Sequence, residues 1–246
     1  MAAAISALAV GTGLLVATTI HAAPRGGHQA IQSLAVAGGS AQILEDVRLT
    51  PALARRLWQT AVDPVVVLGE NDPAARPFKA RPLLPARLRE TTTAGKILID
   101  VVLNPEAPLA RIEMHRLGGA LDLIYLVTTD DDAGWGSYSG RATSLYAVRD
   151  GRLTKLQALA ANGKPEPVIL VNTLKSGWKI RDARPAHTVI EQLYCRPDLL
   201  GDGFLMTFIT YWSDGQAWSV ARRTAPGCWE ADEIWPATAM FPRARR

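Results

Sequence analysis

From Lys96 onward, apolar and polar residues follow the two-residue period of β-strands. Ala110–Leu117 shows this most clearly, with Ala110, Ile112 and Met114 on one face and Arg111, Glu113 and His115 on the other. Ile97–Leu103 is β-branched and apolar, and Leu121–Val127 is an almost unbroken apolar run, as in a strand that is covered on both faces. These three segments are therefore predicted to be strands.

Two Asp-Gly pairs predict β-hairpins, because Asp-Gly between strand-like runs favours a tight turn. Asp150-Gly151 lies between Leu145–Arg149 and Arg152–Leu156. Asp214-Gly215 is the centre of the second predicted hairpin, and counting outward from it sets Tyr211 opposite Trp218 and Ile209 opposite Val220.

The chain before Lys96 has a mixed pattern. Thr50–Ala61 predicts a short helix, because Thr50 is a good N-cap, a proline follows at the first helical position, and two leucines four apart share one face. Pro64–Leu68 is a candidate short strand. Asn71–Pro85 holds four prolines among basic residues, a spacing that predicts an extended surface connection without helix.

Many short strands with hairpin turns and little helix predict a mainly β fold with one short N-terminal helix. The candidate architectures are an antiparallel sandwich, an open barrel or propeller-like sheets, although no repeat of fixed period favours a full propeller. We divide the chain into a signal peptide (1–23), an N-terminal segment with the helix and the Pro-rich connection (24–90) and a β-rich domain (91–246).

The first 23 residues are predicted to be a cleaved signal peptide. Met1–Ala23 carries no Lys, Arg, Asp or Glu, and its apolar run Leu8–Ala17 has the length of a signal-peptide core. The run is too short to span a bilayer, which takes about 20 apolar residues. The alternative is an Ala-rich buried helix, which the lack of a basic residue before the run favours. We expect a secreted or periplasmic protein without a membrane span.

Export changes the interpretation of the two cysteines, Cys195 and Cys228. In an oxidising compartment an isolated pair favours a disulfide over a metal or redox site, with two buried free thiols as the alternative. The pair flanks the second predicted hairpin, so a bond would tie the ends of that hairpin together.

Composition adds one restriction on partners. The chain of 246 residues is 48% hydrophobic and carries a net charge of +4, with an isoelectric point of about 9.3. It has neither a dense basic stripe nor a nucleic-acid-binding module, so we expect no nucleic-acid partner. The oligomeric state is left open.

Motifs for catalysis and for metal binding are not found in the sequence. Three histidines, His28, His115 and His187, are far apart, so no zinc site and no other cofactor is predicted. We interpret His115 as a solvated side chain beside Glu113. Gly136–Gly140 only superficially resembles the nucleophile turn of serine hydrolases. Paired carboxylates of a glycosidase type need only be close in space, so they stay an alternative.

The segment TTDDDAGWGSYSG, Thr128–Gly140, is the candidate binding site and is called the acidic loop below. Asp130, Asp131 and Asp132 are consecutive, whereas a calcium loop spaces its ligands at alternate positions, so metal binding is disfavoured. A solvated turn and a recognition loop both remain. In the second case Trp135 and Tyr138 would offer flat faces to a partner.

Two functions are consistent with this pattern. The first is a non-catalytic binding module of the cell envelope or exterior, whose partner would be an envelope polymer or another exported protein. The second is a secreted hydrolase that uses Asp and Glu carboxylates. A pocket containing a carboxylate of raised pKa would favour the hydrolase.

Overall fold

The computed structural model describes residues 27–244, except positions 37, 61–62, 118–122, 131–139, 151, 185–186, 200, 202 and 216. The fold is mainly β with few helices, as the sequence predicts, and its two sheets fit a sandwich-like architecture. The predicted signal peptide and the alternative N-terminal helix lie outside the described residues.

The first sheet is antiparallel and has four strands in the order β1-β2-β3-β4. Its strands are β1 (His28–Val36), β2 (Gly39–Asp46), β3 (Arg87–Thr92) and β4 (Ile97–Val102). The sequence predicts only the last of them. The division of the chain at residue 90 stays a prediction, and β3 continues across that position.

The helices lie between β2 and β3, and two predictions about this segment are wrong. α1 (Pro51–Thr60) forms as predicted, with the Thr50 hydroxyl 3.2 Å from the Leu53 amide. Pro64–Leu68 is a helix, α2, and not a strand, because the Asp63 carboxylate caps its first turn and Pro64 occupies the N1 position.

The Pro-rich connection is not free of helix either. It contains the 3₁₀ turn η1 (Pro73–Ala75) and the short helix α3 (Arg76–Ala80). Both of their prolines lie within the first turn, where the missing amide proton is not needed. The proline spacing thus restricts where each helix starts and does not forbid the helices.

The second sheet has eleven strands in the order β10-β9-β15-β14-β13-β12-β11-β7-β6-β5, with β8 paired to β7 beside this path. Its first four strands in chain order are β5 (Ala110–Arg116), β6 (Leu123–Asp130), β7 (Gly140–Arg149) and β8 (Arg152–Lys155). The short strands β9 (Gln157–Leu159), β10 (Pro165–Pro167) and β11 (Ile169–Thr173) follow. The long strands are β12 (Ser176–Arg184), β13 (His187–Pro197), β14 (Phe204–Ser213) and β15 (Trp218–Pro226).

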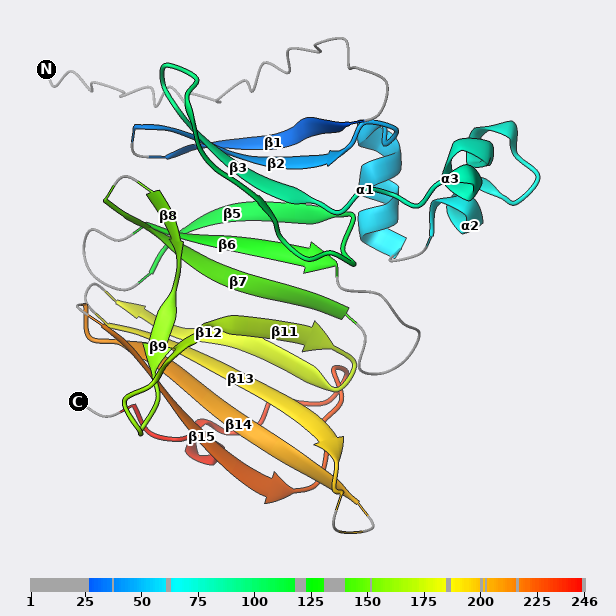
Figure 1. The fold of residues 1–246 in the computed structure, drawn as a ribbon. Coiled ribbons are helices and arrows are strands. Elements are labelled where there is room, and N and C mark those ends of the chain that lie inside the picture. Colours follow the sequence, from blue (N-terminus) through cyan, green and yellow to red (C-terminus); the bar gives the residue numbers. More distant parts are fainter. Residues whose placement is uncertain are drawn as a thin grey trace, which may run out of the picture.

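The first sheet packs on the β5–β8 end of the second sheet, and apolar side chains from both sheets fill the space between them (Figure 1). Ile43 and Leu88 of the first sheet and Ile112 and Tyr125 of the second are fully buried there. Gln32 of β1 links the two sheets, because its amide oxygen lies 3.0 Å from the Ile112 amide and its amide nitrogen 2.6 Å from the Ile112 carbonyl. This end of the molecule is therefore a two-layer sandwich.

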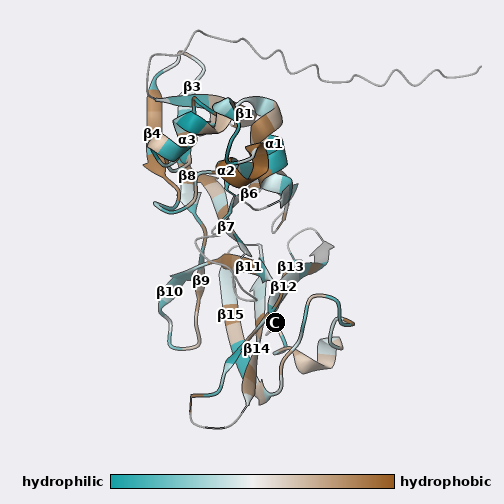
Figure 2. Ribbon diagram, turned by 90° about the vertical axis from the view of Figure 1, so that its right-hand side faces the viewer, coloured by the Kyte–Doolittle hydropathy of each residue, from teal (hydrophilic) through white to brown (hydrophobic). Residues whose placement is uncertain are grey.

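A second apolar core contains side chains from β6 and β7 as well as from β14 and β15 at the other end of the second sheet. Strands β9 and β10 lie to one side of β15 (Figure 2). Residues Arg152–Leu159, which comprise β8 and β9 and are called the strap below, cross in front of this sheet (Figure 1). The strap begins antiparallel to β7 and ends parallel to β15, where Ala158 is the partner of Trp218. Leu156 and Ala158 are buried in the core beneath it.

One predicted hairpin is confirmed and the register of the other is corrected. β7 and β8 pair across Asp150-Gly151, with Arg149 opposite Arg152. β14 and β15 form the second hairpin, but Tyr211 lies opposite Val220, two positions from the predicted pairing. In the structure Asp214 and Ala217 lie at the two ends of the turn: the Asp214 amide donates to the Ala217 carbonyl at 3.3 Å, and the Asp214 carboxylate accepts from the Ala217 amide at 2.9 Å. Contrary to the prediction from the sequence, Asp214 is therefore not a central residue of the turn.

A C-terminal cover, Cys228–Pro242 with the 3₁₀ turn η2 (Thr238–Met240), lies on the outer face of β13 and β14. Trp229 and Phe241 pack on Leu193 and Phe208. Cys195 and Cys228 lie at disulfide distance, with their Cα atoms 5.2 Å apart. The predicted bond would therefore fasten the cover to β13.

Candidate functional site

The structure describes only the base of the predicted acidic loop. Asp131, Asp132, Trp135 and Tyr138 lie outside the described residues, so the recognition role of the loop stays a prediction. Asp130 is described, and it is the last residue of β6 and 6% exposed. The sequence places it in a candidate recognition loop, but it is a buried strand residue whose register partner is Arg141 of β7.

A stack of two arginines on one tryptophan fixes this base to the helix α1. The Arg111 and Arg141 guanidinium carbons lie 4.6 and 4.2 Å from the centre of the Trp58 ring, within the range of cation–π attraction. Arg141 also donates to the Trp58 carbonyl. Arg111 donates to the Glu45 carboxylate and to the Ala110 carbonyl. Both arginines thus bind other parts of the protein, and we assign this cluster a structural role.

Two buried carboxylates, Glu45 and Asp46, lie at the end of β2, and folding shifts their pKa values in opposite directions. Burial raises the pKa of Glu45 above its ordinary value, against the opposing effect of Arg111, whose Nη1 lies 2.8 Å away. Asp46 is equally buried, but hydrogen bonds from Arg48 and from the Leu84 amide outweigh the burial and lower its pKa to about 2. Asp46 therefore stabilises the junction between β2 and its neighbours at neutral pH, whereas the hydrogen bonds of Glu45 only partly offset the cost of burying its charge.

The remaining predictions concern His115, metal binding and a membrane span. His115 Nε2 lies 3.3 Å from Glu113 Oε2 on the partly exposed face of β5, as we interpreted it. No group of three or more potential metal ligands occurs among the residues that the structure describes. Within that same part of the chain, no helix has the length and the apolar composition needed to cross a membrane.

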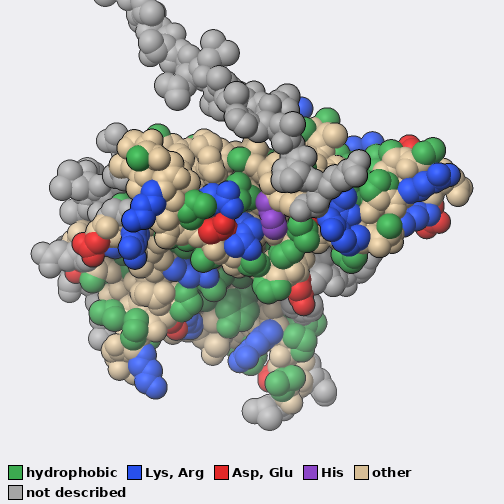
Figure 3. Space-filling model, turned by 45° about the horizontal axis from the view of Figure 1, so that its top comes forward, with side chains coloured by type: hydrophobic (Ala, Val, Ile, Leu, Met, Phe, Trp, Pro, Cys, Tyr) green, Lys and Arg blue, Asp and Glu red, His purple; other side chains and the backbone are tan. Residues whose placement is uncertain are grey.

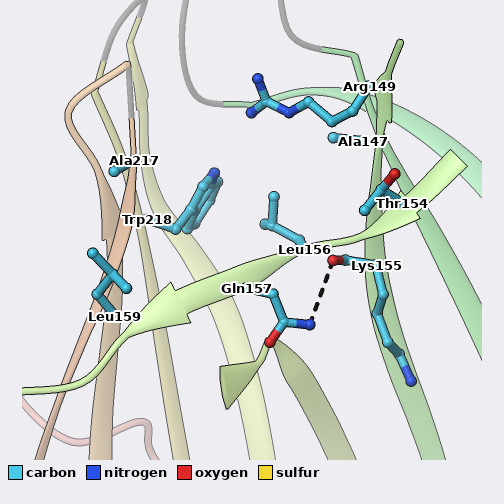
Figure 4. A pocket seen from close by; sticks show the side chains of 9 residues that line it. All are labelled: Ala147, Arg149, Thr154, Lys155, Leu156, Gln157, Leu159, Ala217 and Trp218. Atoms are coloured by element: carbon cyan, nitrogen blue, oxygen red, sulfur yellow. Dashed lines mark hydrogen bonds between the residues drawn. The ribbon is translucent and has the colours of Figure 1, made fainter. Parts of the chain in front are cut away.

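A cavity of about 330 Å³ opens between the strap and the start of β15, and we take it as the candidate functional site. Strand β7 forms one wall through Ala147 and Arg149, the strap forms the floor, and Trp218 faces them from β15 (Figure 4). The lining residues are Ala147, Arg149, Thr154, Lys155, Leu156, Gln157, Leu159, Ala217 and Trp218.

The cavity exists because the strap changes its pairing partner at Leu156. The Leu156 amide donates to the Leu145 carbonyl at 2.7 Å, and the next residues then pair with β15 instead of β7. Because the strap pairs first with β7 and then with β15, a space opens between these two strands where the pairing changes. Apolar side chains, Leu156 and Trp218 among them, line the resulting space.

The lining combines an apolar surface with a polar rim. Trp218 and Leu156 are 4% and 6% exposed, so they are held rigidly by the core around them. Arg149, Thr154, Lys155 and Gln157 supply hydrogen-bond donors, and the lining contains no Asp, Glu, His or Cys side chain. Such a surface can hold a small molecule but offers no carboxylate, imidazole or thiol side chain.

Sequence reasoning missed this site. The only local signal is the group of basic residues around Asp150-Gly151, Arg149, Arg152 and Lys155, which flank the predicted turn. The opposite wall comes from Ala217 and Trp218, about 60 residues later in the chain, through a parallel pairing of two residues. No periodic pattern indicates such a contact.

One face of the molecule shows how basic side chains are distributed over the described residues. On the face shown in Figure 3, Lys and Arg side chains lie in separate groups among hydrophobic and uncharged ones, without a continuous stripe. Comparison of the chain with protein-family models, with curated proteins and with solved structures found no match.

Proposed function

We propose that the protein is an exported, non-catalytic binding protein that holds a small molecule in the strap cavity. The observation that carries the proposal is the composition of the cavity lining: a rigid apolar surface, hydrogen-bond donors at the rim and no carboxylate, imidazole or thiol side chain. The volume of about 330 Å³ lies at the lower end of the range for ligand pockets, about 300–1,000 Å³.

The hydrolase alternative has less support. Glu45 is a buried carboxylate of raised pKa, which is the feature we expected of an enzyme, but it does not line the cavity. Its Oε1 accepts from Arg111 and from the Ala110 amide, so that oxygen already has partners within the protein. Export is supported by the cysteine pair at disulfide distance, because such bonds persist in oxidising compartments.

The direct test is titration with N-phenyl-1-naphthylamine, a neutral apolar dye whose fluorescence rises when it leaves water. We expect a saturable increase with one site per chain. Ala217 is exposed at the rim of the cavity, so Ala217→Trp adds a ring into the opening without disturbing the core. This variant should weaken dye binding by at least about tenfold, since it occupies the apolar space.

The matched control is Ala52→Trp, the same substitution at an exposed position of α1, in the other half of the molecule. It should bind the dye as the unmodified protein does. Equal binding by both tryptophan variants, or a fluorescence increase that does not saturate, would refute the cavity as the binding site.

A further inference from the structure

We infer that the ligand of the strap cavity is a small organic anion, with a carboxylate or sulfonate group attached to a flat apolar body. This inference rests on the proposed function and names the chemical class of the ligand. Its basis is that two of the nine lining side chains are cationic and none is anionic.

The positions of the two cations differ, and the difference assigns them different roles. In Figure 4 the Arg149 side chain extends along one side of the cavity toward Trp218, whereas the Lys155 ammonium group points downward, away from Trp218. Arg149 therefore contacts a group bound above Leu156, and Lys155 contributes charge from a greater distance. A guanidinium fork matches the two oxygens of a carboxylate.

Arg149 already takes part in an interaction within the protein. Its guanidinium carries five N–H donors, so it can bind a ligand oxygen without giving up an existing partner. A third cation strengthens the local field, because Arg152 lies directly opposite Arg149 across the hairpin. Like charges in directly opposed positions repel, and an anion bound beside them relieves that repulsion.

The apolar part of the ligand is expected to lie on Trp218 and Leu156. Both side chains are more than nine-tenths buried, so little ordering is required of them when a ligand binds. An aromatic body gains from stacking on the indole ring. The combination of one charged rim and one aromatic wall favours an amphipathic anion over a neutral sugar or a cation.

The test compares two dyes that share one scaffold. 8-Anilinonaphthalene-1-sulfonate carries the body of N-phenyl-1-naphthylamine together with an anionic sulfonate. We expect the anionic dye to bind about tenfold more tightly than the neutral dye at low salt, and this advantage should shrink as salt is raised. Arg149→Gln should remove most of the advantage and leave the neutral dye unaffected, and Lys155→Gln should remove a smaller part.

Arg55→Gln is the matched control, because it removes the same charge from an exposed position of α1. It should leave both dissociation constants unchanged. Equal affinities for the two dyes, or an equal loss of anionic-dye binding in Arg55→Gln, would overturn the anion class while the cavity still binds the neutral dye. Failure of both dyes to bind would refute the proposed function and this inference together.

Discussion

At the residue scale, Asp46 shows how one buried charge organises a whole connection. Its carboxylate accepts from Arg48 Nε and Nη2 at 2.9 and 2.6 Å and from the Leu84 amide at 3.0 Å. The same guanidinium donates to the carbonyls of Pro77, Arg81 and Pro82. The pair thereby attaches the chain after α3 to the end of β2. Neither partner stands out in the sequence, because the contacts join positions about 30 to 40 residues apart.

Replacing Asp46 by Asn should lower the free energy of unfolding by about 2 kcal/mol at neutral pH, since the pKa falls from 3.8 to about 2 on folding. A lowered pKa stabilises the fold above pH 3.8, and this contribution is lost as the pH falls through about 2. Denaturant unfolding of both proteins between pH 6 and pH 2 measures it. The two stabilities should converge toward the acid end; a constant difference would contradict this role of Asp46.

At the element scale, the C-terminal cover depends on the joined cysteines and on aromatic packing. Trp229 and Trp235 meet edge to face with ring centres 5.5 Å apart, and Trp235 stacks on Phe241 at 5.7 Å. The Thr210 hydroxyl donates to the Pro242 carbonyl at 2.8 Å, which fastens the end of the cover to β14. Cys228 fixes its beginning, so the cover is held at both ends.

Replacing Cys195 and Cys228 together by Ser should lower the free energy of unfolding by about 3 to 4 kcal/mol, because the bond restricts a loop with a sequence separation of 33 in the unfolded chain. Thermal unfolding of both proteins measures the loss. Peptide mapping without reductant provides the control, and recovery of both cysteines as free thiols from the unmodified protein would rule the bond out.

The elements also show how far the sequence predicts this fold. Strands with a clear period, such as β5, and the hairpin at Asp150-Gly151 could be predicted because their determinants are local. α2 could not, since Pro64–Leu68 is apolar and β-branched and its helix depends on the Asp63 cap. The register at Asp214 and the turn of the strap at Leu156 depend on a few hydrogen bonds that no pattern of residue types encodes.

At the scale of the whole molecule, one long sheet takes part in three apolar clusters. Its β5–β8 end forms a sandwich with the first sheet, strands from β6 to β15 contribute to a core beneath the strap, and β13 and β14 pack under the C-terminal cover. The strap belongs to both regions, because Leu153 packs in the sandwich and Leu156 in the second core. The cavity lies beside the strap, between the walls that β7 and β15 contribute.

The measurement that tests this account most directly is hydrogen–deuterium exchange with and without saturating N-phenyl-1-naphthylamine. Binding in the cavity should slow exchange of the backbone amides at 154–159 in the strap and at 217–218 in β15, and leave β1–β4 unchanged, since the ligand would restrain only the walls that it contacts. Protection confined to the acidic loop at 131–139, or to the first sheet, would contradict the cavity as the site of binding.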